Sequence, residues 1–417
     1  MVDREQSSTG SSPTAIVLGG GLAGIAAALR LAEAGWGVTL LETRQRLGGR
    51  ATSHIDPSTG EPLDNSQHIL LACCTNLLDL YRRLDVEHLI DWHEQIHFLT
   101  RDGRHDVLRR SRLPAPLHLS ASLLGFGSLS WQSKLAIARG MLAVLHERSP
   151  HDASQRFSEW LARHDQPREA IERFWNVFVV AALNETVETA GAGYALQVFR
   201  DGVLRHRNAY LMGVPRVSLG QLYGSVPQRL AAAGGRVLLR RSIRAICASG
   251  DRISGVELAD GSRVSGDLYI SALPVDRLSR LLPADVLERD ERFGGIGKIG
   301  HSPIIGIHLT FDRPVMELAQ AALLDSPLQW VFNKGRSALG YRIQAVVSAA
   351  HEWVELSPEQ ILARTLPELG AYLPAAGEAR LVDYQIVKER RATFCPGPDV
   401  DRYRPASAGR TQNLLLA

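Results

Sequence analysis

The sequence predicts an α/β protein in which a Rossmann-like nucleotide-binding domain is interrupted by an inserted α+β domain. Near the N-terminus a short apolar strand runs into a glycine-rich turn and a helix, which is how such a nucleotide-binding domain begins. Further along, helical blocks are followed by strand patterns typical of an antiparallel sheet. The 417 residues exceed what one ordinary core supports, so we expect two intertwined domains.

The glycine-rich turn follows the strand Ala15–Leu18 and has the spacing G-x-G-x-x-G. In this pattern Gly19 permits a tight turn, Gly21 lets the backbone reach a pyrophosphate, and Gly24 lets the helix pack closely on the strand. The N-terminus of that helix would face the phosphates. Glu42 ends the next strand, where an acidic side chain can hold ribose hydroxyls. These features predict a dinucleotide site formed by Gly19, Gly20, Gly21, Gly24 and Glu42.

The residues that follow Glu42 distinguish a site for a flavin dinucleotide from a site for a nicotinamide dinucleotide. Arg44 is followed by a second glycine pair, Gly48 and Gly49, and then by Arg50. The glycine pair lets the chain pass close to a ligand, and a guanidinium suits a phosphate. This extension resembles the FAD-dependent amine oxidase and phytoene desaturase superfamily and implies FAD, because nicotinamide dehydrogenases generally lack it.

Composition excludes several classes of function. A net charge of +3 with 22% charged residues gives no reason to expect nucleic acid as a partner. A mean hydropathy of −0.07 and the lack of a long apolar run argue against a membrane-spanning helix. Residues 1–13 are polar and Ser-rich, which predicts a disordered leader and not a secretory signal. We therefore expect a cytoplasmic protein, with peripheral contact to the inner face of the membrane left open.

The four cysteines fit neither a disulfide framework nor zinc spacing, and we expect them to be buried apolar fillers. A second metal signal, His93-Glu94-Gln95-Ile96-His97, matches H-E-x-x-H, which binds zinc when it lies on a helix. Trp92–Thr100 and His105–Leu108, however, read as two strands around an Asp-Gly turn. Residues four apart on a strand stand about 13 Å apart, too far to share one ion. The sequence therefore predicts no metal site.

Three further segments each allow two interpretations. The polar turn Asp64–His68 could approach a flavin ring or could be an Asx turn that bonds its own backbone. Pro114–Leu145, apolar with an Arg-rich approach, could be a surface that docks on anionic lipid or a helical lid with a solvated charged rim. Phe157–Ala182, a helical block rich in aromatic residues, could be core or the lining of an apolar pocket.

The remaining pattern predicts the domain order. We expect a helix over Leu219–Ala233 and a strand over Arg236–Leu239, followed by hairpins that include Asp267–Ala272. The later strands suggest an antiparallel sheet with helices on one side. The predicted division is a leader (1–13), a FAD-binding domain in three parts (14–72, 208–290 and 386–417) and a substrate domain in two parts (73–207 and 291–385). The expected later elements are strands at Pro303–Asp312, Leu328–Asn333 and Tyr341–Ser348, and a helix at Pro358–Leu369.

Several passages resemble a narrower family, the squalene-associated FAD-dependent desaturases, which act as hydroxysqualene dehydroxylases in bacterial hopanoid synthesis. The resemblance covers nearly the whole chain and implies a FAD-binding domain of the GR2 type. It also implies reductive removal of the hydroxyl of hydroxysqualene to give squalene. Its passages are Asp64–His68, Ala181–Asn184, Ser302–Pro303, Phe311–Pro314, Gln329–Phe332, Val347–Ala350 and Glu389–Phe394. The FAD contacts that it implies involve Gly19, Gly20, Gly21, Gly24, Glu42, Arg44, Gly48, Gly49 and Arg50, with a backbone contact to adenine near Ile243.

Two departures from that family pattern matter. Ser66 stands where the pattern has glycine, and its hydroxymethyl group could crowd a flavin. The chain also stops at Asn413–Ala417, where the pattern continues into an Ala-Gly-Asp segment that contacts FAD. We therefore expect a truncated sequence with impaired retention of FAD.

Protonation of a departing hydroxyl needs a general acid, and His68 in the polar turn is the candidate. The alternative is a histidine that is hydrogen-bonded into the turn for structural reasons. The same fold would also suit a carotenoid desaturase, an amine oxidase with an aromatic cage, or a non-enzymatic prenyl-lipid carrier similar to the Rab escort proteins. The expected partner is an apolar isoprenoid, with membrane lipid as a further contact.

Overall fold

The computed structural model describes residues 12–147 and 153–417, so the predicted leader, apart from its last two residues, lies outside the described residues. The chain divides into two compact units. Unit 1 contains the segments up to Thr52, Leu219–Gly297 and Tyr403–Ala417. Unit 2 contains Ser53–Ser218 and Lys298–Arg402.

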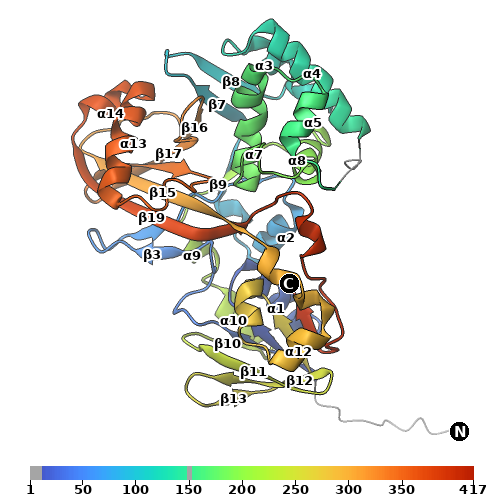
Figure 1. Ribbon diagram of the computed structural model, residues 1–417. Helices are drawn as coiled ribbons and strands as arrows, with labels where there is room; N and C mark the ends of the chain where they lie inside the picture. Colours follow the sequence, from blue (N-terminus) through green and yellow to red (C-terminus); the bar gives the residue numbers. More distant parts are fainter. Residues whose placement is uncertain (1–11, 148–152) are drawn as a thin grey trace, which may run out of the picture. The chain divides into compact units, whose positions relative to one another are not determined.

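Unit 1 is built on a five-stranded parallel sheet with the order β10-β2-β1-β14-β20. Its strands are short, nearly continuous apolar runs, as expected for a parallel sheet that is covered on both faces. The helices α1 (Leu22–Glu33) and α10 (Val226–Ala232) contact each other (Figure 1). The strands are β1 (Thr14–Leu18), β2 (Gly37–Leu41), β10 (Arg236–Leu238), β14 (Leu268–Ser271) and β20 (Leu414–Leu416).

Two expectations for unit 1 were wrong. The predicted hairpin strand at Asp267–Ala272 is instead β14, a parallel strand beside β1. The predicted helix Leu219–Ala233 is two helices, α9 (Leu219–Leu222) and α10, because Pro227 occupies the first turn of α10 and favours a new helix start there. An antiparallel sheet and two short helices complete the unit: β11 (Ile243–Ser249), β12 (Arg252–Leu258), β13 (Arg263–Val264), α11 (Val275–Ser279) and α12 (Ala284–Arg289).

Unit 2 is built on a seven-stranded sheet with the order β19-β15-β18-β17-β16-β7-β8. All neighbouring strands are antiparallel except β16 and β7. Alternate residues of its strands enter different cores, because successive side chains point to opposite faces. The strands are β7 (Gln95–Leu99), β8 (His105–Arg109), β15 (His301–Phe311), β16 (Gln320–Leu323), β17 (Trp330–Ser337), β18 (Gly340–Val347) and β19 (Leu381–Phe394).

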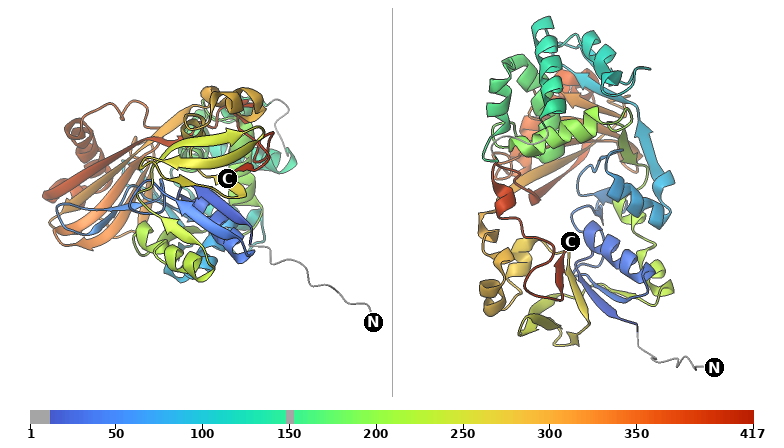
Figure 2. Two further views of the ribbon diagram at one scale, coloured as in Figure 1. Left: turned by 90° about the horizontal axis from the view of Figure 1, so that it is seen from below. Right: turned by 90° about the vertical axis from the view of Figure 1, so that its right-hand side faces the viewer.

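Helices cover both faces of this sheet, so the expectation of helices on one side was wrong. Val331 packs with α13 (Pro358–Tyr372) and α14 (Pro374–Glu378) on one face. Trp330 and Phe332 pack on the other face with a bundle of helices. Both layers are visible in Figure 1 and in the right-hand view of Figure 2. The bundle includes α4 (Trp131–His146), α5 (Phe157–Arg163), α7 (Asn176–Leu183) and α8 (Ala192–Phe199).

The aromatic residues of the helical block form core. Phe157, Trp160 and Trp175 are fully buried, and the rings of Trp175 and Phe199 stand 4.6 Å apart. They pack on one another, which favours the core interpretation over a pocket lining. The block is not one helix, because the chain breaks before Pro167, where the residue preceding proline avoids helical geometry.

The H-E-x-x-H match lies on strands, as predicted. His93 ends β6 (Ile90–His93), and His97 lies on β7, which forms a hairpin with β8. The ring nitrogens of His97 and His105 face each other at 2.9 Å across that hairpin. The smaller elements of unit 2 are β3 (Ser53–Ile55), β4 (Pro62–Asp64), β5 (Leu70–Leu71), β9 (Met212–Pro215), α2 (Thr75–Leu84), α3 (Ser120–Gly125) and α6 (Arg168–Ala170).

Three other expectations can be compared with the structure. The first boundary of the nucleotide domain falls at Thr52 and not at residue 72, because the chain after β4 packs against β15. The last boundary follows Arg402, since β19 belongs wholly to the large sheet. The cysteines are unpaired but not buried as expected, and Cys74, just before α2, is exposed. No helix among the described residues is long and apolar enough to cross a membrane.

Candidate functional site

The glycine turn of unit 1 has a backbone that only glycine fits. Gly19 has a φ of +102° and donates its N–H to the carbonyl of Leu41 at 2.9 Å. A Cβ atom on Gly24 would lie 1.9 Å from the carbonyl oxygen of Gly19. These contacts let α1 start directly against the end of β1.

The second glycine pair crosses directly over the first. Gly48 donates its N–H to the carbonyl of Gly20 at 2.8 Å and forms a parallel bridge with Gly21. A Cβ on Gly49 would lie 3.0 Å from the Cα of Gly21. We call these two contacting turns, residues 19–24 and 48–49, the glycine crossing. A Cβ on Gly21 would meet only Gly49 within 4 Å, so space is open before α1.

The N-terminus of α1 is suited to a phosphate group. Its N-cap, Gly21, makes no side-chain cap, and the first turn of the helix contains no acidic residue. The positive end of the helix dipole and its first N–H groups are therefore not compensated by a side chain of that turn. The open space before Gly21 and these donors together fit the pyrophosphate of a dinucleotide.

Glu42 lies beside the glycine crossing with both oxygens oriented by the backbone. It is buried, Oε2 accepts from the N–H of Gly20 at 2.8 Å, and Oε1 accepts from the N–H of Arg44 at 2.7 Å. Each carboxylate oxygen keeps a further lone pair that can accept from a ribose hydroxyl. The backbone N–H of Arg241 donates to the carbonyl of Glu42 at 2.9 Å. The residues just before Ile243, which begins β11, therefore lie beside Glu42.

Arginines surround the second turn. Arg44 Nη1 donates to the carbonyl of Gly49 at 3.2 Å, and Arg44 and Arg50 are both exposed. Arg46 Nε is buried and has no hydrogen-bond partner among the described residues. A buried donor of this kind calls for an acceptor, and a phosphate of FAD would supply one. The described residues of unit 1 therefore fit the cofactor that the sequence predicts.

His68 belongs to unit 2 and is not part of this group of residues. Its Nε2 lies 3.2 Å from Asn65 Oδ1, so the ring is bonded within the polar turn, as its structural interpretation expects. Gly306 of β15 makes room for the turn, because a Cβ there would lie 3.0 Å from the carbonyl oxygen of Asn65. Lys334 Nζ donates to Gln67 Oε1 at 3.0 Å, and burial lowers the pKa of this lysine. No sequence signal links Gly306 or Lys334 with this turn.

Four of the passages that carry the family resemblance meet at one buried side chain of unit 2. Asn184 Nδ2 donates to the carbonyl of Ser302 at 3.0 Å and to Thr393 Oγ1 at 3.1 Å. Its Oδ1 accepts from the N–H of Ala349 at 2.7 Å. Asn184 itself is 3% exposed and has a φ of +56°, a left-handed conformation that asparagine tolerates. We call these residues the Asn184 cluster.

A buried carboxylate extends this cluster. Glu185 is 2% exposed and accepts a hydrogen bond from Ser302 Oγ. His351 Nε2 lies 2.7 Å from Glu185 Oε1, while the imidazole is half-exposed. This acid–histidine pair was missed in the sequence, because its members are 166 positions apart and match no short motif.

The parallel sheet, the glycine crossing and the oriented acid together define a FAD-dependent oxidoreductase with an inserted α+β domain. The family described as flavin containing amine oxidoreductase matches residues 22–417. The chain belongs to this family, and its cofactor is FAD.

Proteins similar to this chain include carotenoid desaturases. A 15-cis-phytoene desaturase of Synechococcus elongatus is 28% identical over 96% of this chain and 89% of its own length. A probable zeta-carotene desaturase of the same organism is 23% identical over 96% of this chain and 92% of its own. A solved oxidoreductase from Methanosarcina mazei has a TM-score of 0.70 at 17% identity and covers 97% of this chain and 94% of that one, which shows the fold alone.

Proposed function

We propose that this FAD-dependent oxidoreductase acts on a linear isoprenoid, and specifically that it converts hydroxysqualene to squalene. The observation that carries the proposal is the Asn184 cluster, in which passages resembling the hydroxysqualene dehydroxylases lie in mutual contact. Passages that lie far apart in the sequence, resemble the same family and contact one another in the fold are expected to share a role. The desaturase relatives, which match 96% of the chain, support a long isoprenoid as the substrate class.

The proposed reaction breaks one C–O bond and forms one C–H bond. Bound FAD in its reduced form would supply the hydride for this carbon, and the departing hydroxyl would take up a proton and leave as water. The protein would exclude water and protonate the leaving group. His68 is the candidate donor, and its contact with Asn65 would hold the ring in one orientation.

A second candidate, dehydrogenation of a carotenoid precursor, is favoured by the names of the relatives. That reaction removes two hydrogens from adjacent carbons and needs oxidised flavin, so its electron flow is opposite. The third reading, a lipid carrier, predicts binding of the isoprenoid without any change in the flavin.

One experiment separates the three. Photoreduced protein is mixed anaerobically with hydroxysqualene, and oxidised protein is mixed with phytoene, while flavin absorbance and products are followed. Flavin reoxidation together with equimolar squalene supports the dehydroxylase. Flavin reduction by phytoene with formation of a longer polyene replaces that proposal with the desaturase. Bound isoprenoid with an unchanged flavin spectrum in both arms supports the carrier.

The role of His68 has its own test. We expect His68→Gln to lower the turnover number about 100-fold or more, because a positioned general acid contributes that much, while flavin content stays unchanged. His88→Gln, a change in the short helical turn before β6, is the matched control and should leave turnover unchanged. Equal turnover in His68→Gln and the unaltered protein removes His68 from the mechanism.

A further inference from the structure

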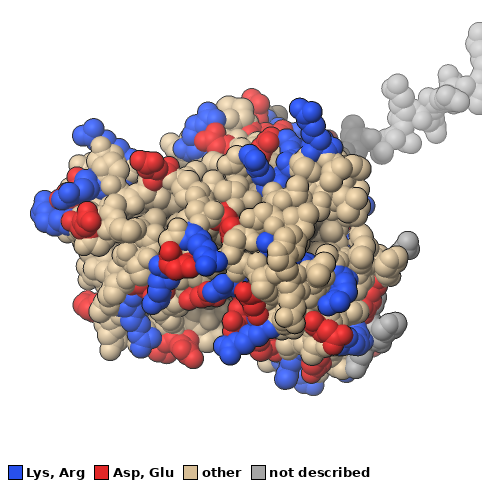
Figure 3. Space-filling view, turned by 90° about the horizontal axis from the view of Figure 1, so that it is seen from above, with Lys and Arg blue, Asp and Glu red and all other residues tan. Residues whose placement is uncertain are grey.

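Exposed apolar side chains gather on one part of unit 2. Ten large apolar side chains of the described residues are exposed, and seven of them lie between Leu113 and Leu145. Figure 3 looks down on the end of unit 2 where α3 and α4 lie in Figure 1, and it shows wide tan areas between charged groups. We call this surface, which consists of Leu113, Leu117, Leu124, Trp131, Leu135, Leu142 and Leu145, the α3–α4 face.

Helix α4 is apolar on both of its sides. Ile137 and Val144 are fully buried against the helical core of unit 2. On the opposite side Trp131, Leu135 and Leu142 are 65%, 60% and 56% exposed. A helix that only covers a core has a polar outer side, so the interpretation as a lid with a solvated charged rim does not explain this one. A contiguous exposed apolar patch marks an interaction surface.

The exposed charged side chains of this region are all basic. From Gly103 to His146 the sequence contains six Lys and Arg residues and one carboxylate, Asp106. Asp106 is buried and accepts from the N–H groups of Gly127 at 2.7 Å and Ser128 at 2.9 Å. The surface therefore combines apolar side chains with basic ones and contains no exposed carboxylate between those positions; the exposed arginines are Arg104, Arg109, Arg112 and Arg139.

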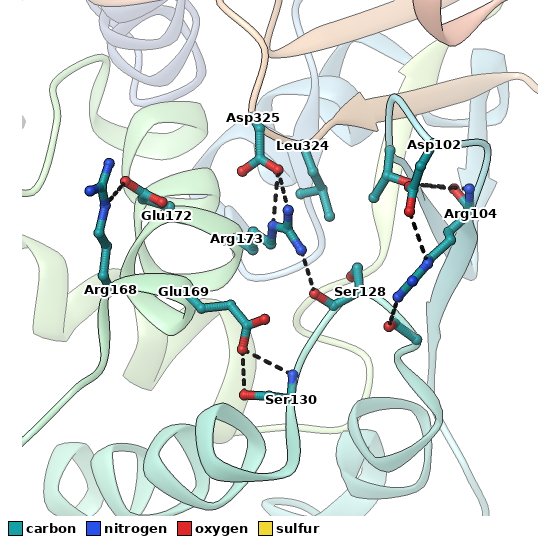
Figure 4. A network of polar contacts seen from close by, with 12 residues as sticks. Asp102, Arg104, Ser128, Ser130, Arg168, Glu169, Glu172, Arg173, Leu324 and Asp325 are labelled. Carbon is teal, nitrogen blue, oxygen red and sulfur yellow. Dashed lines mark hydrogen bonds and ion pairs between the residues drawn. The ribbon is translucent and has the colours of Figure 1, made fainter.

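Polar contacts on the inner side hold the loop before α4 in place (Figure 4). Arg104 Nη1 donates to the carbonyl of Gly127 at 2.7 Å, and Arg173 Nη1 donates to that of Ser128 at 2.8 Å. Glu169 Oε2 accepts from the N–H of Ser130 at 2.9 Å. These hydrogen bonds fix the backbone of the loop from which α4 and its exposed leucines extend. The carboxylates near this loop are themselves paired with arginines or hydrogen-bonded. The other pairs are Asp325 with Arg173, Glu172 with Arg168, and Asp102 with Arg104.

We propose that the α3–α4 face docks on a phospholipid bilayer that contains anionic lipid. The leucines and Trp131 would enter the boundary between headgroups and acyl chains, and Arg109, Arg112 and Arg139 would contact anionic headgroups. A second copy of the chain fits less well, because a two-fold interface would place this basic face against the same basic face of its partner. The proposal goes beyond the catalytic function and does not depend on it.

The first test measures partition onto sedimenting vesicles, using holoprotein and either phosphatidylcholine alone or its mixture with phosphatidylglycerol. We expect binding to the mixture, and Leu135→Gln/Leu142→Gln should lower that partition about tenfold or more, because two exposed apolar side chains that would enter the bilayer are lost. The matched control, Ile55→Gln/Leu339→Gln, changes two exposed residues outside the face, 63% and 40% exposed, and should stay within about twofold. Equal thermal stability of the two variants excludes a folding effect.

The second test addresses charge. Arg112→Gln/Arg139→Gln should lower binding to the anionic mixture about tenfold or more and leave binding to phosphatidylcholine unchanged, and added salt should have a similar effect. Arg313→Gln/Arg336→Gln is the matched control, because both of its arginines are exposed and lie outside the face.

Absence of vesicle binding by the unaltered protein, or equal loss in the face and control variants, overturns the proposal. A dimer in solution that Leu135→Gln/Leu142→Gln converts to a monomer, without any vesicle binding, would assign the face to a second copy instead. Binding is measured without turnover, so failure of the proposed reaction would leave this result unaffected.

Discussion

The glycine crossing of unit 1 and the Asn184 cluster of unit 2 are built in opposite ways. The crossing comes from two short segments, and its geometry depends on the absence of side chains, since a Cβ on Gly24 or Gly49 would meet backbone atoms. The cluster comes from three segments that each lie more than 100 positions from Asn184, whose side chain connects them. A site that depends on backbone geometry leaves a short local motif in the sequence. A side-chain hub, meaning one side chain that joins distant segments, leaves no such motif.

The largest expected effect tests whether unit 1 also depends on a side-chain hub. Asp290 and Arg292, 2% and 5% exposed at the side chain, form an ion pair at 2.7 Å. Arg292 donates to the carbonyls of Ser407 and Leu414, and the N–H of Thr411 donates to Asp290, so the pair holds β20 in place. Asp290→Ala leaves a buried guanidinium without its partner and should cost about 3–5 kcal/mol of unfolding free energy.

Hydrogen exchange measured by segment checks this prediction. Exchange of Leu414–Leu416 and its neighbour β14 should rise strongly, while β15 of unit 2 keeps its protection. The double variant Asp290→Leu/Arg292→Met removes both charges and should recover part of the loss. Unchanged exchange at β20 in Asp290→Ala would contradict the role of the pair.

This contrast between backbone and side chains explains which parts of the molecule were predictable. The strand–turn–helix of unit 1 was predicted because Gly19, Gly24 and Glu42 have fixed spacing, and each does its work through local geometry. The register of β14 beside β1 was not predicted, because a short apolar run suits a parallel strand as well as a hairpin. The pairing of Glu185 with His351 was not predicted either, because it depends on how distant segments fold together.

The second prediction concerns the close approach of Gly24 to the backbone of Gly19. Gly24→Ala places a Cβ where the carbonyl of Gly19 lies, so α1 must move away from β1. We expect a cost of about 3 kcal/mol and loss of most bound FAD, read as flavin absorbance per polypeptide. Gly37→Ala is the matched control, because its Cβ would make only ordinary contacts at 3.6 Å or more. A fully flavinated Gly24→Ala protein would show that the close approach is dispensable.

The third prediction tests the hub of unit 2. Asn184→Ala leaves the N–H of Ala349 and the carbonyl of Ser302 without this partner, which should cost about 2 kcal/mol. Exchange should rise around β15 and β18 while flavin content is retained. Asn184→Gly relieves the positive φ but restores no hydrogen bond, so a full rescue by glycine would show that backbone strain, and not the hub, decides stability.

The smallest expected effect concerns pH and lies in unit 2 at His308. Burial lowers the pKa of His308 to about 3, assisted by the positive charges of Arg342 and Lys334, while the nearby backbone of Asp64 opposes the shift. The histidine is 3% exposed, and its Nε2 lies 3.4 Å from Gln344 Nε2. In the unfolded chain the same ring has a pKa of about 6.5.

The unfolded state therefore binds one more proton than the folded state between these two values. The stabilisation is complete above about pH 6.5 and is lost as the pH falls toward the folded pKa. From about pH 7 to about pH 5 this group should remove about 1–2 kcal/mol of unfolding free energy, and His308→Gln should lack that part of the slope. Denaturant unfolding at both pH values measures the difference, and the nearby Arg342–Asp56 ion pair contributes equally to both proteins. Parallel pH profiles for the two proteins would mean that water reaches His308 in the folded state and that this part of the sheet is less closed than its packing indicates.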